Sequence, residues 1–341
     1  YTKSYYIGAS NGPRVHEYLH ELNEKVLKRY DVMTVGEAPN TNADQALRYT
    51  KPENEELNMV FHFDHMHLDY GRYGKFSDVR FKLSELKRVL SEWQDKLAEG
   101  WNSLYWSNHD QPRAVTRFGD DGVYRVESAK MLATLLQMMK GNTYIFQGEK
   151  LGMKNVPFEK VEDYQDIETQ YFLQLMKEKG EPESYIKESM YLKSRDNART
   201  PFPWNGDAND GYGFSPSKPW IAYSSDNQFI NAESALEDEG SVFYYYKQLI
   251  ALRHQLPIIV HGDYELINES DSNVYSYLRT YENQMLLVVC SFADKPTYVD
   301  LPKELLERSG RCLIHKYPKE PSSLNVKQEL QPYEAFVYLF D

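Results

Sequence analysis

Carboxylates and histidines recur at the ends of short apolar runs in the first half of this 341-residue chain. The set comprises Glu37, His62, Asp64, His65, His109, Asp110 and Glu149. A carboxylic acid can protonate a leaving oxygen while a neighbouring carboxylate stays ionised and stabilises positive charge. Several carboxylates crowded into one cavity raise the pKa of one of them, as the acid role requires. We therefore expect acid–base chemistry if the fold brings these residues together.

The most informative run is "GWNSLYWSNHDQPRAV", residues 100–115, in which an apolar segment stops at His109 and Asp110. Taken alone, this pair could also be a polar strand end that bonds its own turn. Glu37, at the end of "TVGE", could likewise be a solvated carboxylate that opens a loop. The elements that carry these residues decide between the two interpretations.

Short strands alternate with helices along the first 150 residues. The predicted strands are 31–37, 57–65, 101–110 and 143–149, and the predicted helices are 14–30, 83–97 and 126–139. This alternation is typical of parallel βα units, and the unbroken apolar runs fit strands buried on both faces. The polar residues fall at the carboxyl ends of the strands, which is the face that carries the active site in a (β/α)8 barrel.

The second half of the chain has a different pattern. Residues 154–235 are irregular and aromatic-rich, with two helices predicted between 166 and 192, and a further helix is predicted at 241–255. After Pro257 the apolar runs become short and separated by turns, as in an antiparallel β-sandwich. Strands are predicted at 274–281, 284–292, 297–301, 311–317 and 335–340. We therefore divide the chain into residues 1–257 and an all-β domain at 258–341.

Composition excludes several classes of partner. The formal net charge of −12, from 39 basic and 51 acidic side chains, disfavours binding to nucleic acid and to anionic membrane surfaces. Only Cys290 and Cys312 could form a disulfide, and Cys290 lies in an apolar run, so a reduced thiol is expected. Neither a signal peptide nor a bilayer-spanning run is evident. We expect a cytoplasmic protein that needs no cofactor.

Five motifs carry a family resemblance. "VGEAPN", "GWNSLYWSNHDQPRAV", "FQGEKLGM", "DIE" and "RDNARTPFPW" occur in this order. The chain resembles α-glucosidases of the α-amylase superfamily, glycoside hydrolase family 13, in the subgroup of oligo-1,6-glucosidases, dextran glucosidases and trehalose-6-phosphate hydrolases. The resemblance covers essentially the whole chain.

The resemblance implies roles for five residues. Glu37 would be the general acid/base and Asp110 the transition-state stabiliser, with His109 as its partner on sugar hydroxyls. Arg195 would pair with carboxylates of the pocket and contact glucose in the innermost subsite. Glu168 would face the adjoining sugar, although an acid in the first turn of a helix also complements the helix dipole. The residue types suit retaining hydrolysis, in which one carboxylic acid protonates the leaving oxygen and a second carboxylate attacks.

The family places its nucleophile on an aspartate in a segment resembling "GFRxD", which has no counterpart here. From the resemblance we therefore expect the C-terminal half of a (β/α)8 barrel in residues 1–257, followed by the β-sandwich. The missing N-terminal half of the barrel would be the partner that completes the site, and this chain alone would be inactive. Half a barrel would leave an open parallel edge and an uncovered apolar face, so we also expect aggregation or dimerisation.

Several activities fit the resemblance. The first hypothesis is release of terminal α-1,6-linked glucose from short oligosaccharides such as isomaltose. The alternatives are hydrolysis of trehalose 6-phosphate, α-1,4-glucosidase activity, sucrose isomerisation, and a non-catalytic glucosidase-like subunit. Family isomerases carry an "RLDRD" loop where this chain has "HLDYG" at 67–71, which weighs against isomerisation. Retention of the residues assigned to the site weighs against the non-catalytic subunit.

Other patterns favour structural interpretations. "HFDHMH" at 62–67 contains metal-ligand types, but neither a cysteine nor a second cluster supports a metal site, so none is expected. Arg199 is predicted to be structural rather than ligand-contacting. The tyrosine run at 244–246 is predicted to pack a helix rather than to bind sugar.

Overall fold

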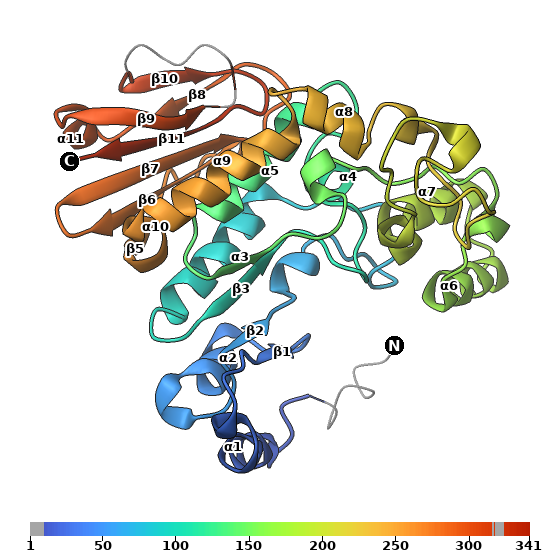
Figure 1. The fold of residues 1–341 in the computed structure, drawn as a ribbon, viewed down its shortest axis with the longest axis horizontal. Coiled ribbons are helices and arrows are strands. Elements are labelled where there is room, and N and C mark those ends of the chain that lie inside the picture. Colours follow the sequence, from blue (N-terminus) through green and yellow to red (C-terminus); the bar gives the residue numbers. More distant parts are fainter. Residues whose placement is uncertain (1–9, 316, 318–323) are drawn as a thin grey trace.

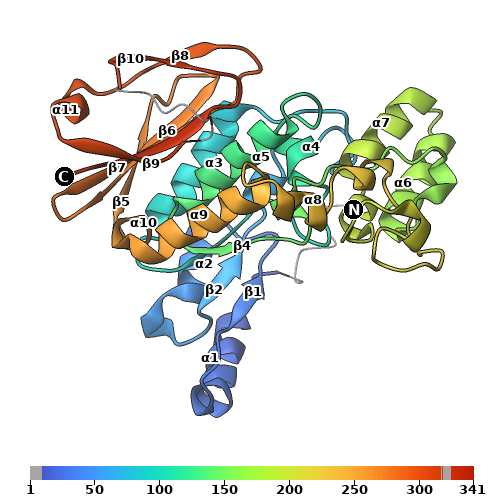
Figure 2. The ribbon, with the colours of Figure 1, turned by 45° about the horizontal axis from the view of Figure 1, so that its top comes forward.

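The computed structural model describes residues 10–315, 317 and 324–341. A parallel sheet and its helices lie between two flanking regions (Figures 1 and 2). The antiparallel C-terminal domain lies on one side, and the irregular segment with helices α6 and α7 lies on the other. The N-terminal helix α1 projects away from both.

The predicted parallel sheet is confirmed. Its strands are β1 (Val35–Glu37), β2 (Met59–Phe61), β3 (Asn102–Tyr105) and β4 (Asn142–Tyr144), hydrogen-bonded in the order β1-β2-β3-β4. Every neighbouring pair is parallel. The strands are shorter than predicted because the chain turns away soon after each pairing; after β2 it enters a short 3₁₀ helix at Asp64–Met66. The carboxyl ends of all four strands therefore open onto one edge of the sheet.

Helices surround this sheet much as the periodicity predicted. They are α1 (Val15–Lys25), α2 (Ala43–Thr50), α3 (Leu83–Lys96), α4 (Ala114–Phe118), α5 (Arg125–Gln137), α9 (Val242–Gln255) and α10 (Pro257–His261). Helices α2, α4 and α10 were not predicted, although a capping box at the start of α2 links Asn42 and Gln45. Helix α5 is buried along nearly its whole length, because α9 covers one side and the C-terminal sheet another.

The irregular segment forms a small unit with its own apolar core. Its helices are α6 (Ile167–Glu178), α7 (Glu183–Lys193) and α8 (Ala232–Glu237), and the five-residue 3₁₀ helix η6 (Arg195–Arg199) follows α7. The two helices predicted between 166 and 192 are thus confirmed. Phe76, from the loop after β2, stacks on Phe172 of α6 and so joins this unit to the parallel sheet.

The C-terminal domain consists of two antiparallel sheets. One has the order β5-β6-β7-β11-β9 and the other pairs β10 with β8. The strands are β5 (Asp263–Ile267), β6 (Val274–Tyr281), β7 (Gln284–Ser291), β8 (Thr297–Asp300), β9 (Gly310–His315), β10 (Lys327–Leu330) and β11 (Ala335–Phe340), with α11 at Lys303–Leu306. Strands β5 and β10 were not predicted, and residue 316 of the predicted 311–317 strand lies outside the described residues.

Both faces of the five-stranded sheet are buried, which explains the apolar runs in its sequence. On β7, Val288 and Cys290 face the core shared with α5 and α9, while Leu287 and Val289 face the core under β8 and β10. Alternate residues of β6 and β11 divide between the same two cores. The domain is therefore packed onto the helices of the parallel sheet over a whole face.

Hydrogen bonds reinforce this junction. Buried Lys87 of α3 donates to the carbonyl oxygens of Asn268, at 2.8 Å, and Asp271, at 2.7 Å, in the turn between β5 and β6. The Tyr277 hydroxyl on β6 donates to the carbonyl oxygen of Leu135 on α5 at 2.8 Å. Polar groups of the helices and of the C-terminal domain thus form hydrogen bonds with each other across the junction.

Helix α1 has an unusual surface. Val15 and Leu19 pack against the cluster around α2, but Tyr18, Leu22 and Val26 are 53%, 43% and 43% exposed. These three residues follow one another at intervals of four and so form a stripe along the helix. Within the part of the chain that the structure describes, no helix is long and apolar enough to cross a membrane.

Candidate active site

Asp110 lies in the turn after β3 and is held by two arginines. Its Oδ1 atom is 2.7 Å from Arg199 Nη2 and 3.2 Å from Arg195 Nη1. The backbone N–H of Asp110 donates to Asn108 Oδ1 at 2.8 Å, which fixes the turn. The Asp110 carboxylate is therefore not needed to hold its own turn. It contacts the two arginines of η6 instead.

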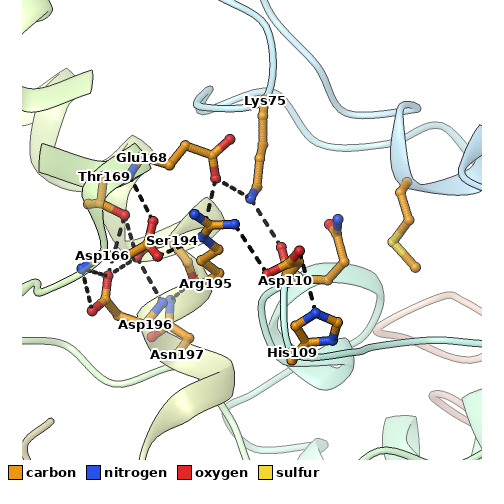
Figure 3. A network of polar contacts seen from close by, with 12 residues as sticks. Lys75, His109, Asp110, Asp166, Glu168, Thr169, Ser194, Arg195, Asp196 and Asn197 are labelled. Atoms are coloured by element: carbon orange, nitrogen blue, oxygen red, sulfur yellow. Dashed lines mark hydrogen bonds and ion pairs between the residues drawn. The ribbon is translucent and has the colours of Figure 1, made fainter. Parts of the chain in front are cut away.

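His109 leaves one side of this carboxylate accessible. Its Nε2 atom lies 3.6 Å from Asp110 Oδ2, and its side chain is 66% exposed (Figure 3). The carbonyl oxygen of His109 accepts a hydrogen bond from Arg199 Nε at 3.1 Å. The backbone is thus fixed while the imidazole and Asp110 Oδ2 face outward together, where both can meet hydroxyl groups of a ligand.

A second carboxylate, Asp166, completes a bridge of four charges. Its Oδ2 atom is 2.6 Å from Arg195 Nε and 2.7 Å from Arg199 Nη1. Its Oδ1 atom accepts the Glu168 N–H at 2.9 Å, so Asp166 also caps the N-terminus of α6. Burial alone would raise the pKa of Asp166, but Arg195, the Glu168 N–H and Arg199 together hold it below its ordinary value. Each arginine therefore joins Asp110 to a second carboxylate, Asp166, whose pKa is lowered.

Glu168 and Lys75 extend the network. Lys75 Nζ lies 2.8 Å from Glu168 Oε2 and donates to the carbonyl oxygen of Asp110 at 3.1 Å. Arg195 Nε is 3.8 Å from the same Glu168 oxygen. Burial lowers the pKa of Lys75, while the neighbouring Glu168 opposes that shift. Three carboxylates thus face three cations, so the charges of the network balance. Figure 3 shows Lys75, Asp110, Asp166, Glu168 and Arg195 of this network.

The spacing within "RDNAR" follows from the fold of η6. Buried Asp196 accepts the backbone N–H groups of Gln165, at 2.8 Å, and Asp166, at 3.1 Å, and so fixes the start of α6. Asn197 is also buried and donates to the carbonyl oxygen of Tyr191 at 3.0 Å. Asp196 and Asn197, in the middle of the motif, are therefore buried and fix the position of η6. Arg195 and Arg199, at its two ends, contact Asp110.

Glu37 ends β1, as predicted, and its side chain is exposed. In the sheet order, β2 separates it from β3, the strand that leads to Asp110. Among the described residues, Glu37 takes no part in the ion-pair network around Asp110. Its role as general acid stays a prediction, and an exposed carboxyl at this edge is open to a ligand.

The remaining strand-end groups serve packing. His62 stacks on Trp93 with ring centroids 3.9 Å apart, and burial lowers its pKa well below the ordinary value. His65 Nε2 donates to the carbonyl oxygen of Tyr105 at 2.9 Å, and burial lowers the pKa of His65 to about 3. Glu149 accepts hydrogen bonds from the hydroxyls of Ser107 and Tyr246, and burial raises its pKa.

Metal-ligand types gather elsewhere on the surface. Among the described residues, His20, Glu24 and Glu55 form a group of three whose ligand atoms lie within 4.8 Å of one another, and all three are exposed. Glu24 and Glu55 are already paired with Lys28. This surface group is accounted for by ion pairing.

The network contains residues that the sequence did not single out. Asp166 and Lys75 were not predicted, and Arg199 was predicted to be structural although it contacts Asp110 directly. Asp166 could have been found as the polar residue before an apolar-periodic helix, because aspartate there is a typical N-cap. Lys75 has no such local signal.

Comparison with known proteins agrees with this fold. The model of the alpha-amylase catalytic domain matches residues 3–262, and that of the maltogenic amylase C-terminal domain matches residues 264–337. An oligo-1,6-glucosidase of Parageobacillus thermoglucosidasius is 49% identical over 330 residues, 96% of this chain and 58% of that protein. A trehalose-6-phosphate hydrolase of Bacillus subtilis (strain 168) is 44% identical over 96% of this chain and 59% of its own length.

Solved structures give the same result. A trehalose-6-phosphate hydrolase of Bacillus licheniformis is similar with a TM-score of 0.92 and 45% identity, over 97% of this chain and 60% of that one. Isomaltulose synthase from Klebsiella sp. LX3 is similar with a TM-score of 0.91 and 36% identity. The match covers 97% of this chain and 59% of that one. The chain thus spans less than two thirds of the length of the relatives it matches. With a parallel βα sheet of the TIM-barrel kind and an antiparallel C-terminal domain, it belongs to the alpha-amylase family of glycoside hydrolases.

Proposed function

We propose that this chain belongs to a retaining α-glucosidase that releases terminal glucose from short α-1,6-linked oligosaccharides such as isomaltose. One observation carries the proposal. Arg195 and Arg199 hold one oxygen of Asp110, while its other oxygen lies beside the exposed ring of His109. The similarity to oligo-1,6-glucosidases supports the choice of linkage.

In this proposal Asp110 and His109 bind neighbouring hydroxyls of the glucose that is cleaved. Retaining hydrolysis passes through an oxocarbenium-like transition state, and hydrogen bonds to the sugar strengthen as its ring flattens. Because Asp110 is fixed before substrate arrives, that strengthening needs no rearrangement of the carboxylate. Arg195 contacts the same glucose and pairs with Asp110. Glu168, with Lys75 on one oxygen, faces the adjoining sugar.

Glu37 is the proposed proton donor to the leaving oxygen. A retaining enzyme also needs a nucleophilic carboxylate about 5 Å from the acid. Near Asp110, Asp166 and Glu168 are occupied by Arg195, Arg199 and Lys75. We propose that the nucleophile comes from a further barrel segment, and that the 341-residue chain alone releases no glucose.

Two surfaces support a segment of that kind. Among the described strands, β1 pairs only with β2 and so stands at an end of the sheet, where a further strand can pair. The stripe of Tyr18, Leu22 and Val26 presents exposed apolar side chains on α1, the helix that precedes β1 in the chain. A segment that adds a parallel strand beside β1 and packs on α1 would cover both.

Glucose release from isomaltose tests the proposal. The assay compares the 341-residue chain with the longest natural product that contains it, each as parent, Glu37→Gln and Asp110→Asn. We expect release by the longer product and its loss in both variants. Release by the 341-residue chain that disappears in Glu37→Gln would refute the need for a further segment. Unchanged release in both variants would refute the assigned roles.

The same assay with trehalose 6-phosphate, maltose and sucrose separates the alternative activities. Trehalose 6-phosphate is the main competitor, because hydrolases of that substrate are among the similar proteins. A kcat/KM for trehalose 6-phosphate above that for isomaltose would overturn the proposed linkage. Conversion of sucrose to an isomer without glucose release would show an isomerase.

A further inference from the structure

Three buried ionic side chains meet beneath the proposed site. Asp69 accepts two hydrogen bonds from Arg117, from Nη2 at 2.6 Å and from Nε at 2.8 Å. Lys193 Nζ pairs with Asp69 Oδ2 and donates to the backbone carbonyl oxygen of Asp69 at 3.2 Å. All three side chains are at most 3% exposed. They contact neither Asp110 nor its two arginines, so they belong to a separate cluster.

The cluster joins three segments that carry or flank the site. Asp69 lies in the loop after β2, Arg117 lies in α4, and Lys193 is the last residue of α7. Lys193 precedes Arg195 by two residues, at the point where α7 passes into η6. Its ammonium therefore fastens the segment of the two site arginines to the loop region of the parallel sheet.

Arg117 carries the connection on to Asp110. Its Nη1 atom donates to Gln111 Oε1 at 2.7 Å, and its Nη2 atom donates to the carbonyl oxygen of Met66 at 2.5 Å. Gln111 is the residue after Asp110 and is itself buried. An unbroken series of contacts thus runs from Lys193 through Asp69, Arg117 and Gln111 to the turn of Asp110.

The charge of the cluster makes Lys193 unusual. One carboxylate faces two cations, so the buried cluster contains one more basic than acidic side chain. Burial and Arg117 lower the pKa of Lys193 to about 8, although Asp69 opposes the shift. Arg117 alone satisfies both oxygens of Asp69 in a bidentate pair. A second buried cation costs desolvation energy that Asp69, already paired with Arg117, does not fully offset.

We propose that Lys193 is a positioning residue, which sets the distance between the Arg195–Arg199 helix and Asp110 through Asp69 and Arg117. The role in catalysis rests on the function proposed above. The geometry explains the connection: Asp110 receives its two guanidinium contacts from η6, whereas its backbone belongs to the β3 turn. Arg113, three residues after Asp110, also joins the two segments through the carbonyl oxygen of Asn197 at 2.9 Å. The cluster of Lys193, Asp69 and Arg117 adds a second, charged fastening at the start of η6.

Lys193→Met tests this, because methionine fills similar space without the charge. Lys187→Met is the matched control on the same helix, where the lysine is 54% exposed and pairs only with Glu183. With arginine side chains isotopically labelled, solvent exchange of the guanidinium protons of Arg195 and Arg199 reports their contacts with Asp110. We expect at least about 10-fold faster exchange in Lys193→Met, and parental rates in Lys187→Met. Lys193→Arg should restore slow exchange.

Activity gives a second readout in the product that hydrolyses isomaltose. At a temperature well below the unfolding midpoint of each variant, Lys193→Met should lower kcat/KM about 100-fold, mainly through kcat. Parental exchange rates together with a lowered midpoint would show a merely structural lysine and overturn the proposal. If no product releases glucose, the proposed function fails, and the exchange measurement still decides whether Lys193 positions the arginines.

Discussion

Arg199 Nη2 lies 2.7 Å from Asp110 Oδ1, a contact between the turn after β3 and a 3₁₀ helix 89 residues further along the chain. The same guanidinium reaches Asp166 through Nη1 and the carbonyl oxygen of His109 through Nε. One planar side chain therefore fixes the orientation of the proposed transition-state stabiliser.

Arg199→Lys should reveal this geometry. Lysine keeps the charge but is a single point donor, so it cannot span Asp110 and Asp166 while also holding the His109 carbonyl. We expect kcat/KM for isomaltose to fall about 100-fold with little change in stability. Steady-state kinetics and a thermal melt measure both quantities. Activity within about 2-fold of the parent would contradict the role.

Asp166→Asn separates charge from helix capping. Asparagine caps a helix N-terminus as well as aspartate does, so α6 should remain intact by circular dichroism. The loss of one negative charge leaves Arg195 and Arg199 with an excess positive charge beside Asp110. We expect a lower kcat/KM, by about 10- to 100-fold, with helix content preserved. A parental rate would mean that Asp166 only caps the helix.

Stability should fall in acid because of the buried histidines. The folded-state pKa of His65 is about 3, that of His62 is also lowered, and an unfolded histidine titrates near 6.5. Below that pH the unfolded state binds more protons, so the free energy of unfolding decreases as the pH falls towards 3. Each histidine contributes at most about 1.4 kcal/mol per pH unit.

Urea unfolding between pH 7 and pH 4.5 measures that slope. His62→Phe keeps a ring against Trp93 without the titrating group, so its slope should be shallower than that of the parent. Identical slopes would show that His62 does not contribute.

Lys87→Met should weaken the junction between the parallel sheet and the C-terminal domain. Carbonyl oxygens in the β5–β6 turn would lose their donor while remaining buried, at a cost of about 2–4 kcal/mol. Arg88→Met is the control, because that neighbour on α3 forms only exposed ion pairs and should change stability by about 0.5 kcal/mol or less. Equal effects of the two substitutions would argue against the junction.

The exposed stripe on α1 should drive association of the isolated chain. We expect dimers or larger species in solution scattering, because Tyr18, Leu22 and Val26 offer exposed apolar surface and, among the described strands, β1 stands at an end of its sheet. Leu22→Lys should shift the population towards monomer, whereas Glu21→Lys, on a residue already charged, should not. A parent chain that is a monodisperse monomer would contradict this prediction.

Local sequence patterns predicted most elements but not every one. Helices α3, α5 and α9 and strands β6, β7 and β11 have clear apolar periodicity or continuous apolar runs, and all were found. Strand β10 reads "KQEL" and buries only alternate residues. Three of its four side chains are polar, so it has no apolar run that would predict a strand. Helix α2 is short and mostly polar along its exposed side, and only its cap marks the start.

The site was predictable to the extent that its residues stand in motifs. His109, Asp110, Arg195 and Glu168 were singled out in this way, and the structure places them in one network, while their roles stay predictions. Lys75 could not be found, because its partners lie 35 and 93 residues away and no local period relates them. Glu37 was placed at its strand end, but nothing in the described contacts links it to Asp110.

The five-stranded sheet buried on both faces has a consequence for how this chain can be divided. Its inner face shares one continuous core with α5 and α9. Neither the parallel-sheet region nor the C-terminal domain can therefore bury its apolar surface without the other. The boundary between the two matched sequence families, near residue 263, therefore separates regions of sequence but not units of folding. The two should unfold in a single cooperative transition. An exchange of C-terminal domains between relatives would have to carry the side chains of both facing surfaces along with it.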